Sequence, residues 1–140
     1  MSKIAVVFWS GTGNTGVMAT SVAEGAKEAG AECDVIYVSD FSADKMDAYD
    51  AIAFGCPSMG AEQLEEGEFE PVFLACEPKL SGKKIGLFGS YGWGDGEWMR
   101  TWEETCQNDG AVMPHDFVIC NEAPDEDAVN QCKELGKALV

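Results

Sequence analysis

The chain has 140 residues, 46% of them hydrophobic, and a formal net charge of −16 from 25 acidic and 9 basic residues. Its length predicts a single domain over residues 1–140, and its negative charge disfavours nucleic acids and anionic membranes as partners. Neither an apolar run of transmembrane length nor a signal-peptide pattern is present, so we expect a cytoplasmic protein with no membrane partner.

Patterns typical of strands and helices alternate along the whole chain. We predict strands at residues 3–8, 33–38, 51–55, 85–89 and 112–120. We predict helices at residues 15–29, 43–46, 70–76, 97–108 and 126–139. Pro114 interrupts the last strand and places it at an edge. This α/β alternation predicts a five-stranded parallel sheet with helices on both faces, and a ligand beyond the carboxyl ends of the strands.

The segment from Trp9 to Gly16 joins the first strand to the first helix and is the most informative stretch of the chain. A strand, a tight glycine turn and a helix N-terminus make an anion site, because unpaired N–H groups and the positive end of the helix dipole converge there. The loop contains no lysine or arginine, so it predicts a phosphate site built from neutral donors. These side-chain donors are Ser10, Thr12, Asn14 and Thr15.

Three other interpretations of this loop fit less well. Gly11, Gly13 and Gly16 satisfy the dinucleotide pattern G-x-G-x-x-G, and Asp40 lies where the ribose-binding acid would stand. The hydroxyl-rich loop instead suits a terminal phosphate monoester. A Walker P-loop would need a Gly-Lys-Ser/Thr sequence, which is absent. An ordinary turn that caps the helix would need one hydroxyl and not several.

Two further loops at the same predicted edge carry unusual residues. The loop after the fourth strand places Tyr91 and Trp93 among glycines. An aromatic residue in such a surface loop suits stacking on a flat ring, although Tyr91 can instead pack beneath the loop. After the third strand, Gly60 allows a peptide to flip between two orientations, and Glu62 can accept a hydrogen bond from an imide N–H. A phosphate loop, a stacking loop and a flexible turn on one edge together indicate flavin mononucleotide (FMN).

The predicted topology also separates charges along the strand direction. The eight lysines fall at or toward the edge where the strands begin, and only Arg100 belongs near the ligand edge. That ligand edge instead gathers Asp40, Glu62, Glu65, Glu66, Glu68, Asp95, Glu97, Glu122 and Asp125.

The cysteines are well separated and form no C-x-x-C pair, so neither an iron–sulfur nor a structural zinc site is predicted. We expect reduced thiols that pack mostly as small hydrophobic side chains. No metal site is expected, and His115 is interpreted as a solvated turn residue. The six cysteines are Cys33, Cys56, Cys76, Cys106, Cys120 and Cys132.

The three loop sequences closely resemble short-chain bacterial flavodoxins, in order and at matching spacing over the entire chain. They are Trp-Ser-Gly-Thr-Gly-Asn-Thr, Gly-Cys-Pro-Ser-Met-Gly-Ala-Glu and Leu-Phe-Gly-Ser-Tyr-Gly-Trp-Gly-Asp-Gly. The resemblance implies a doubly wound parallel sheet of order 2-1-3-4-5 with non-covalently bound FMN. It further implies a monomeric, low-potential one-electron carrier, not an enzyme, that cycles mainly between semiquinone and hydroquinone. Its partners would be redox proteins with basic docking surfaces, met in transient complexes.

Carried over residue by residue, the resemblance assigns phosphate binding to the donors of the first loop. Met59 and Trp93 would flank the two faces of the isoalloxazine, Glu62 would bind its imide N–H, and the Gly60 carbonyl would turn toward N5. Asn121 would approach the ring from the end of the fifth strand. The full set expected at the cofactor is Trp9, Ser10, Gly11, Thr12, Gly13, Asn14, Thr15, Pro57, Ser58, Met59, Gly60, Ala61, Glu62, Ser90, Tyr91, Gly92, Trp93, Gly94 and Asn121.

The chain departs from this family's pattern at three positions. Gly16 stands where relatives often carry glutamate, Ala61 replaces an acid or a serine, and Pro57 removes a hydroxyl that some relatives offer to the phosphate. These departures put semiquinone stability in doubt, but not the fold or the cofactor.

Three other classes of protein share the topology. A small FMN-dependent NAD(P)H:quinone or flavin reductase is the alternative function, although short loops and a lack of basic residues leave little room for a nicotinamide. A signalling receiver domain would need paired acids and a phosphorylatable aspartate at positions that hold other residues here. A low-molecular-weight phosphatase would need an arginine six positions after its cysteine, which the chain lacks.

Overall fold

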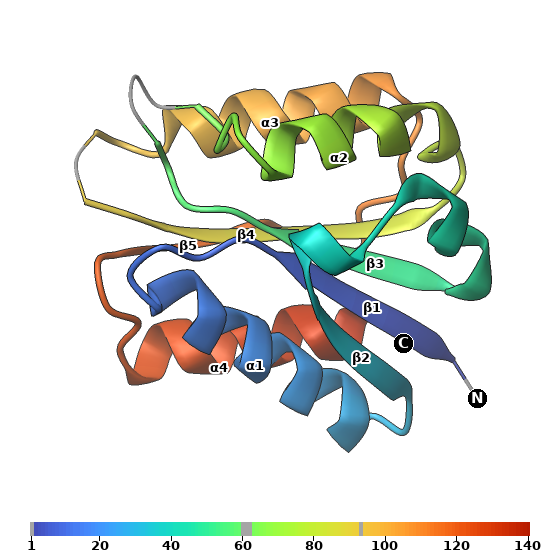
Figure 1. Ribbon diagram of the computed structural model, residues 1–140. Coiled ribbons are helices and arrows are strands. Elements are labelled where there is room, and N and C mark those ends of the chain that lie inside the picture. The colour runs from blue at the N-terminus through green and yellow to red at the C-terminus, as the bar shows by residue number, and fades with distance from the viewer. Residues whose placement is uncertain (1, 60–62, 93) are drawn as a thin grey trace.

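The computed structural model describes residues 2–59, 63–92 and 94–140 (Figure 1). Five parallel strands form one sheet in the order β2-β1-β3-β4-β5, which confirms the predicted strand order. The strands are β1 (Lys3–Phe8), β2 (Glu32–Tyr37), β3 (Ala51–Gly55), β4 (Lys84–Tyr91) and β5 (Val118–Asn121). β1 and β3 are apolar and buried over almost their whole length, as expected for central strands covered on both faces.

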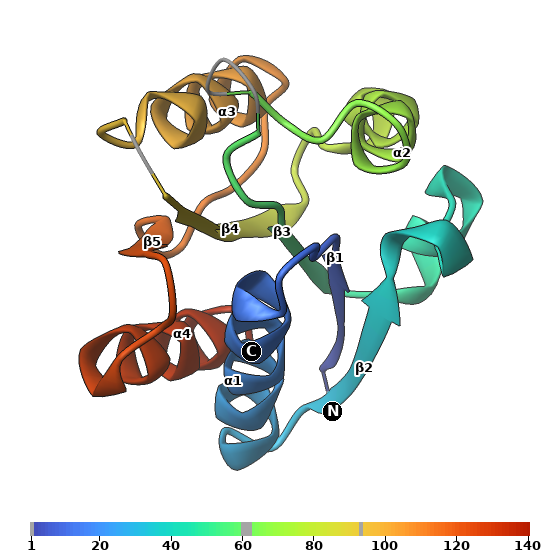
Figure 2. The ribbon, with the colours of Figure 1, turned by 60° about the vertical axis from the view of Figure 1, so that its left-hand side comes forward.

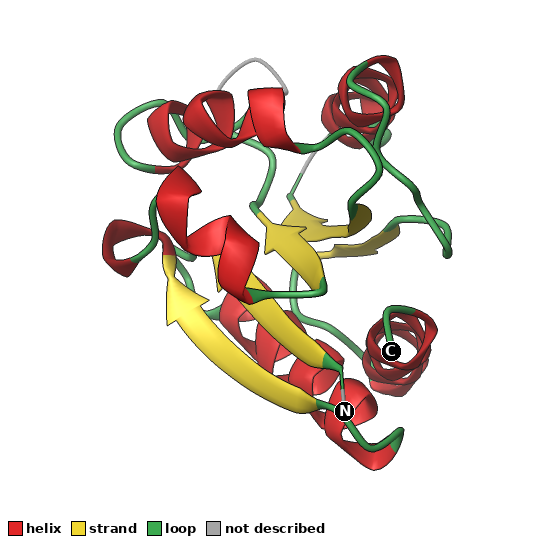
Figure 3. Ribbon diagram, turned by 90° about the vertical axis from the view of Figure 1, so that its right-hand side faces the viewer, coloured by secondary structure: helices red, strands yellow, loops and turns green. Residues whose placement is uncertain are grey.

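Four α-helices cover the two faces of the sheet, α1 and α4 on one face and α2 and α3 on the other (Figures 1 and 2). They are α1 (Asn14–Glu28), α2 (Phe69–Cys76), α3 (Glu97–Asn108) and α4 (Glu126–Ala138). Among the described residues, three short 3₁₀ helices lie in the connections: η1 (Val38–Asp40), η2 (Ala43–Ala48) and η3 (Glu77–Lys79). Figure 3 shows the strands in yellow between the helices of the two layers. No helix in these described ranges is long and apolar enough to cross a membrane.

The sheet separates two hydrophobic cores. Under α2 and α3, the buried rings of Phe54, Phe69, Phe73 and Trp102 form a cluster of edge-to-face and stacked pairs with centroids 5.4–6.4 Å apart. The other core lies under α1 and α4 and consists mainly of aliphatic side chains, together with the buried ring of Phe88. Both faces are therefore closed, and the polar ligand chemistry is confined to the edges of the sheet.

Three strands differ from their predicted bounds, and β2 is shifted by only one residue at each end. β4 is longer than expected because Ser90 and Tyr91 pair with β5, although their sequence resembles a loop. β5 is shorter, since only Val118–Asn121 joins the ladder. Upstream of it, Val112 forms an isolated parallel bridge with Lys84, and its carbonyl accepts from Ile85 N at 2.8 Å. Pro114 lacks the N–H that a continuous strand would need, so the pairing lapses until Val118.

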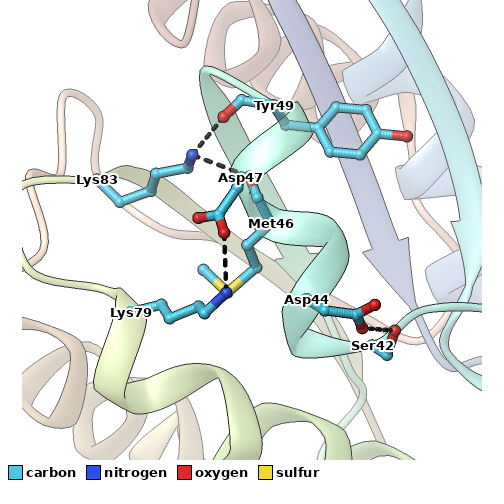
Figure 4. A network of polar contacts seen from close by, with 7 residues as sticks. All are labelled: Ser42, Asp44, Met46, Asp47, Tyr49, Lys79 and Lys83. Carbon is cyan, nitrogen blue, oxygen red and sulfur yellow. Dashed lines mark hydrogen bonds and ion pairs between the residues drawn. The ribbon is translucent and has the colours of Figure 1, made fainter.

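Polar contacts fasten the connection between β2 and β3 at the edge where the strands begin (Figure 4). The Lys83 ammonium donates to the carbonyl oxygens of Met46 (3.0 Å) and Tyr49. Lys79 pairs with Asp47 at 3.0 Å, and the Ser42 hydroxyl donates to Asp44 within the same 3₁₀ turn. Lys79 and Lys83 thus stabilise the edge of the sheet opposite the candidate site.

Candidate functional site

A cavity of about 530 Å³ opens at the carboxyl ends of the strands. Its volume lies within the range usual for small-molecule and cofactor sites. The lining comes from the loops that follow β1, β3, β4 and β5, and consists of Trp9, Ser10, Gly11, Thr12, Asn14, Thr15, Pro57, Ser58, Met59, Ser90, Tyr91, Gly92, Glu122 and Ala123.

Parallel pairing continues past the strand ends and fixes these loops relative to one another. Trp9 N donates to the carbonyl of Gly55 at 3.0 Å. Ser58 N donates to the Ser90 carbonyl at 3.0 Å, and Glu122 N donates to the Tyr91 carbonyl at 2.7 Å. Each loop is therefore tied to its neighbour by a backbone hydrogen bond before its side chains reach the cavity.

The first loop ends at a helix terminus suited to an anion. Gly13, with φ 96°, stands at the N-cap of α1 and has no side chain with which to cap it. The Ser10 Oγ accepts from the N–H groups of Gly13 (3.1 Å) and Gly16 (3.2 Å), so its own hydroxyl proton is free to donate elsewhere. The N–H groups of Asn14 and Thr15 belong to the first turn and have no partner within the helix. These donors and the helix dipole attract a negative group.

A buried polar pair forms part of the cavity floor. Thr15 and Ser90 are 1% and 5% exposed, and their hydroxyl oxygens lie 3.0 Å apart. Ser90 N also donates to Thr15 Oγ1 at 3.4 Å. The start of α1 is thereby joined to the end of β4.

The loop after β3 contributes Pro57, Ser58 and Met59. Two backbone hydrogen bonds join Met59 and Gln63, with N···O distances of 2.8 and 3.0 Å. Of the residues expected at the cofactor, Gly60, Ala61 and Glu62 lie outside the described residues, so their predicted roles stay predictions.

Cys56 precedes this loop and packs below it as an inert thiol. Burial raises the pKa of Cys56 to about 12, so the thiol is protonated at neutral pH. Its Sγ accepts from Glu65 N at 3.4 Å, which ties the segment before α2 to the end of β3. All six cysteines are unpaired in the structure.

β4 ends with an aromatic residue, Tyr91, whose ring packs on a second aromatic side chain. Tyr91 is the last residue of β4, and its ring packs against Trp98 with centroids 5.6 Å apart. Trp98 is buried and donates through Nε1 to the Cys56 carbonyl at 3.2 Å. Tyr91 thus packs beneath its loop and also lines the cavity. Trp93, the residue expected to stack on the ring, lies outside the described residues.

Most of the expected site residues that the structure describes line this cavity. Gly13 shapes the first loop without lining it, Gly94 is a left-handed glycine (φ 84°) outside the lining, and Asn121 borders a neighbouring polar hollow. Glu122 and Ala123 line the cavity but were not in the set expected at the cofactor, although Glu122 was expected at this edge of the sheet. The hint in the sequence was their position directly after the last strand, at the same edge as the other loops.

Among the described lining residues, Glu122 is the single charged one. Arg100, the basic residue expected near this edge, pairs with Asp95 at 3.0 Å. No group of three metal-ligating side chains is found within the described ranges. The described lining therefore offers neutral hydrogen-bond donors, one carboxylate and no cation.

Comparison with known proteins identifies the family of this chain over nearly its whole length. The flavodoxin family model matches residues 6–136. The chain is 45% identical to a flavodoxin of Megasphaera elsdenii over 135 residues and 47% identical to one of Clostridium beijerinckii over 134 residues, with 96% of each chain covered. The solution structure of two-electron reduced M. elsdenii flavodoxin superposes with a TM-score of 0.89 at 46% identity and covers 97% of both chains. Oxidised flavodoxin 1 of Bacillus cereus superposes with a TM-score of 0.85 at 27% identity. Sequence motifs, strand order and cavity thus agree, and the chain belongs to the flavodoxin family.

Proposed function

We propose that this chain carries single electrons between redox enzymes at low potential, with FMN held non-covalently in the cavity at the carboxyl edge of the sheet. As a flavodoxin it is an electron-transfer protein and not an enzyme. One observation carries the placement of the cofactor. The N-terminus of α1 opens onto the cavity with neutral donors and no lysine or arginine in the described lining, which suits a phosphate monoester.

The residues present fit this group. The hydroxyls of Ser10, Thr12 and Thr15, the Asn14 amide and the first N–H groups of α1 would hold the phosphate. Met59, Tyr91 and Gly92 line the remainder of the cavity, where a flat ring would lie. The expected ring contacts of Trp93, Gly60 and Glu62 complete the proposal from the resemblance alone. When bound, FMN supplies one-electron redox chemistry.

Electrostatics of the chain favour a low potential. No cation in the described lining offsets the phosphate, and Glu122 adds a carboxylate to the wall. A carboxylate about 10 Å away, at an effective dielectric constant of about 20, opposes an added electron by roughly 1.5 kcal/mol. That energy corresponds to about 60 mV in a one-electron couple. Glu122 is exposed, so salt screening lowers its contribution.

The acidic edge also indicates what kind of partner the protein meets. A flavodoxin exchanges electrons with other redox proteins, and we propose that their docking surfaces are basic and the complexes transient. Association rates would then fall steeply as ionic strength rises. We further propose a monomeric single domain in the cytoplasm, where free thiols such as the six found here are stable.

Stepwise anaerobic reduction of the FMN-loaded protein tests the function. We expect two separate one-electron steps in the visible spectrum, the second at low potential, and no steady consumption of NAD(P)H in the presence of quinone or free flavin. Continuous NAD(P)H turnover would instead establish the reductase alternative, and a protein that binds no FMN would refute both.

The placement of the phosphate has its own test. We expect the apoprotein to bind FMN far more tightly than riboflavin, which lacks the phosphate. Thr12→Val removes one neutral donor and should weaken FMN binding by roughly tenfold while leaving riboflavin binding unchanged. Thr20→Val is the matched control, because the Thr20 hydroxyl bonds the Gly16 carbonyl on the exposed side of α1. Equal losses for FMN and riboflavin would place the phosphate elsewhere.

A further inference from the structure

The indole of Trp9 is held at both ends beside the first loop. Its Nε1 donates to Glu68 Oε1 at 3.2 Å, across 59 residues of sequence. At its other end the ring lies against Gly11, where a Cβ would come within 2.9 Å of Trp9 Cη2 and 3.2 Å of Cζ3. Gly11 has no positive φ, so the close approach of the indole explains why the position suits glycine.

The other partner, Glu68, has a firmly anchored backbone. The Glu65 carboxylate accepts from the N–H groups of Gly67 (2.7 Å), Glu68 (2.7 Å) and Phe69 (2.9 Å), and so caps the start of α2. Burial raises the pKa of Glu65, but these hydrogen bonds outweigh that effect and lower it overall, so the cap is ionised at neutral pH. Phe69 is fully buried in the core. The Glu68 side chain therefore reaches Trp9 from a fixed position.

We propose that Glu68 is a positioning residue for the FMN site: it holds the Trp9 indole against Gly11 and thereby keeps the phosphate loop in its binding geometry before the cofactor arrives. Trp9 and Gly11 both line the cavity, and Ser10, which lies between them, organises the loop through its bonds to Gly13 and Gly16. A ring that swung away from Gly11 would release this segment. The inference rests on the proposed function for its ligand.

The charge of Glu68 acts in the opposite direction, which makes the proposal testable. A carboxylate beside a phosphate site repels the dianion, so electrostatics alone predict tighter FMN binding whenever Glu68 is neutralised. Positioning predicts that the outcome depends on what replaces the carboxylate. Glu68→Gln keeps an acceptor for the Trp9 N–H, whereas Glu68→Met has similar size but no comparable acceptor.

The experiment measures FMN affinity of the apoprotein with both variants. We expect Glu68→Gln to bind FMN as tightly as the wild type or more tightly, and Glu68→Met to bind about fivefold more weakly. Glu66→Met removes a charge from the same turn and should bind as tightly as the wild type or more tightly. In a Trp9→Phe background, which lacks the indole N–H, Glu68→Met and Glu68→Gln should bind FMN equally.

A second measurement uses the apoprotein alone. The Trp9 indole N–H resonance, assigned from its absence in Trp9→Phe, should shift upfield in Glu68→Met and stay near its place in Glu68→Gln. If the resonance and the FMN affinity are the same in both variants, Glu68 does not position Trp9 and the inference is overturned. If the wild type binds no FMN, the proposed function fails, while the indole resonance still reports whether Glu68 holds the ring.

Discussion

The hydroxyl oxygens of Thr15 and Ser90 lie 3.0 Å apart under the cavity, although 75 residues separate them in the sequence. Each is almost completely buried. The pair joins the first turn of α1 to the carboxyl-terminal end of β4. It thereby fixes the phosphate loop relative to the loop expected to stack on the ring.

This pair should be visible in the stability of the apoprotein. Thr15→Val leaves the Ser90 N–H without its acceptor and the Ser90 hydroxyl without its hydrogen-bond partner, and we expect it to cost about 1–3 kcal/mol of unfolding free energy. Ser90→Ala removes only one hydroxyl and should cost less. The double variant should cost clearly less than the sum of the two, because each single change already breaks the same interaction. Strict additivity in urea denaturation would show that the hydroxyls do not interact.

Two glycines of the phosphate loop should respond in opposite ways to alanine. A Cβ at Gly16 would meet Phe8 and Ser10 at 3.6–3.8 Å, which is ordinary contact, and Gly16 has no positive φ. Gly16→Ala should therefore stabilise the protein by about 0.5–1 kcal/mol through higher helix propensity. Gly13 has open space around it but a φ of 96°, so Gly13→Ala should destabilise by about 1 kcal/mol. Thermal unfolding of the two variants tests this prediction. Equal changes in their melting temperatures would show that backbone conformation does not decide the outcome.

Local patterns were sufficient to predict the elements whose signals are contained in their own residues. β1, β3 and α3 have the predicted bounds, because an apolar run or a helix between left-handed glycines needs little long-range information. The phosphate loop was recognisable for the same reason, since its donors are contiguous with a strand and a helix.

Features that depend on distant residues could not be predicted. Pairing with β4 decides where β5 begins, and no local signal marks Val118 as the first residue of β5. Glu122 enters the cavity wall because it adopts φ 56° and donates its N–H to Tyr91, a conformation that sequence patterns seldom assign to glutamate. The contact between Glu68 and Trp9 likewise becomes visible only once α2 is placed beside the end of β1.

The close packing of α1 against α4 leads to a third prediction. A Cβ at Gly25 of α1 would overlap the Lys133 carbonyl, and a Cβ at Gly136 of α4 would overlap the Val22 carbonyl. The overlapped atoms are backbone, so the helices themselves would have to separate. We expect Gly25→Ala and Gly136→Ala each to cost about 2–3 kcal/mol, as overpacking does. Gly16→Ala on the same helix α1 is the control for helix propensity, and a stabilised Gly25→Ala variant would contradict the observed packing.

Glu77 and Asp109 place two carboxyl groups together where the ends of α2 and α3 meet. Burial, a hydrogen bond to the Asp109 side chain and repulsion from that carboxylate raise the pKa of Glu77 to about 7. Asp109 Oδ2 is buried and, among the described residues, lacks a donor unless Glu77 carries a proton. The folded protein therefore holds a proton that the unfolded chain, with an ordinary glutamate, releases near pH 4.5.

The sign of the pH dependence follows from this linkage. Between about pH 4.5 and 7 the folded state binds more protons than the unfolded state at this group, so its contribution to stability falls as the pH rises. Glu77→Gln carries a permanent donor for Asp109 and should remove that loss. We expect it to raise the unfolding free energy at pH 8 by about 1 kcal/mol, after allowing for solvent screening of a partly exposed pair, and to change nothing near pH 4.5. Glu104→Gln on the exposed side of α3 removes the same charge without reaching Asp109. If both variants gain equally at pH 8, reduced net charge explains the effect and Glu77 shares no proton with Asp109.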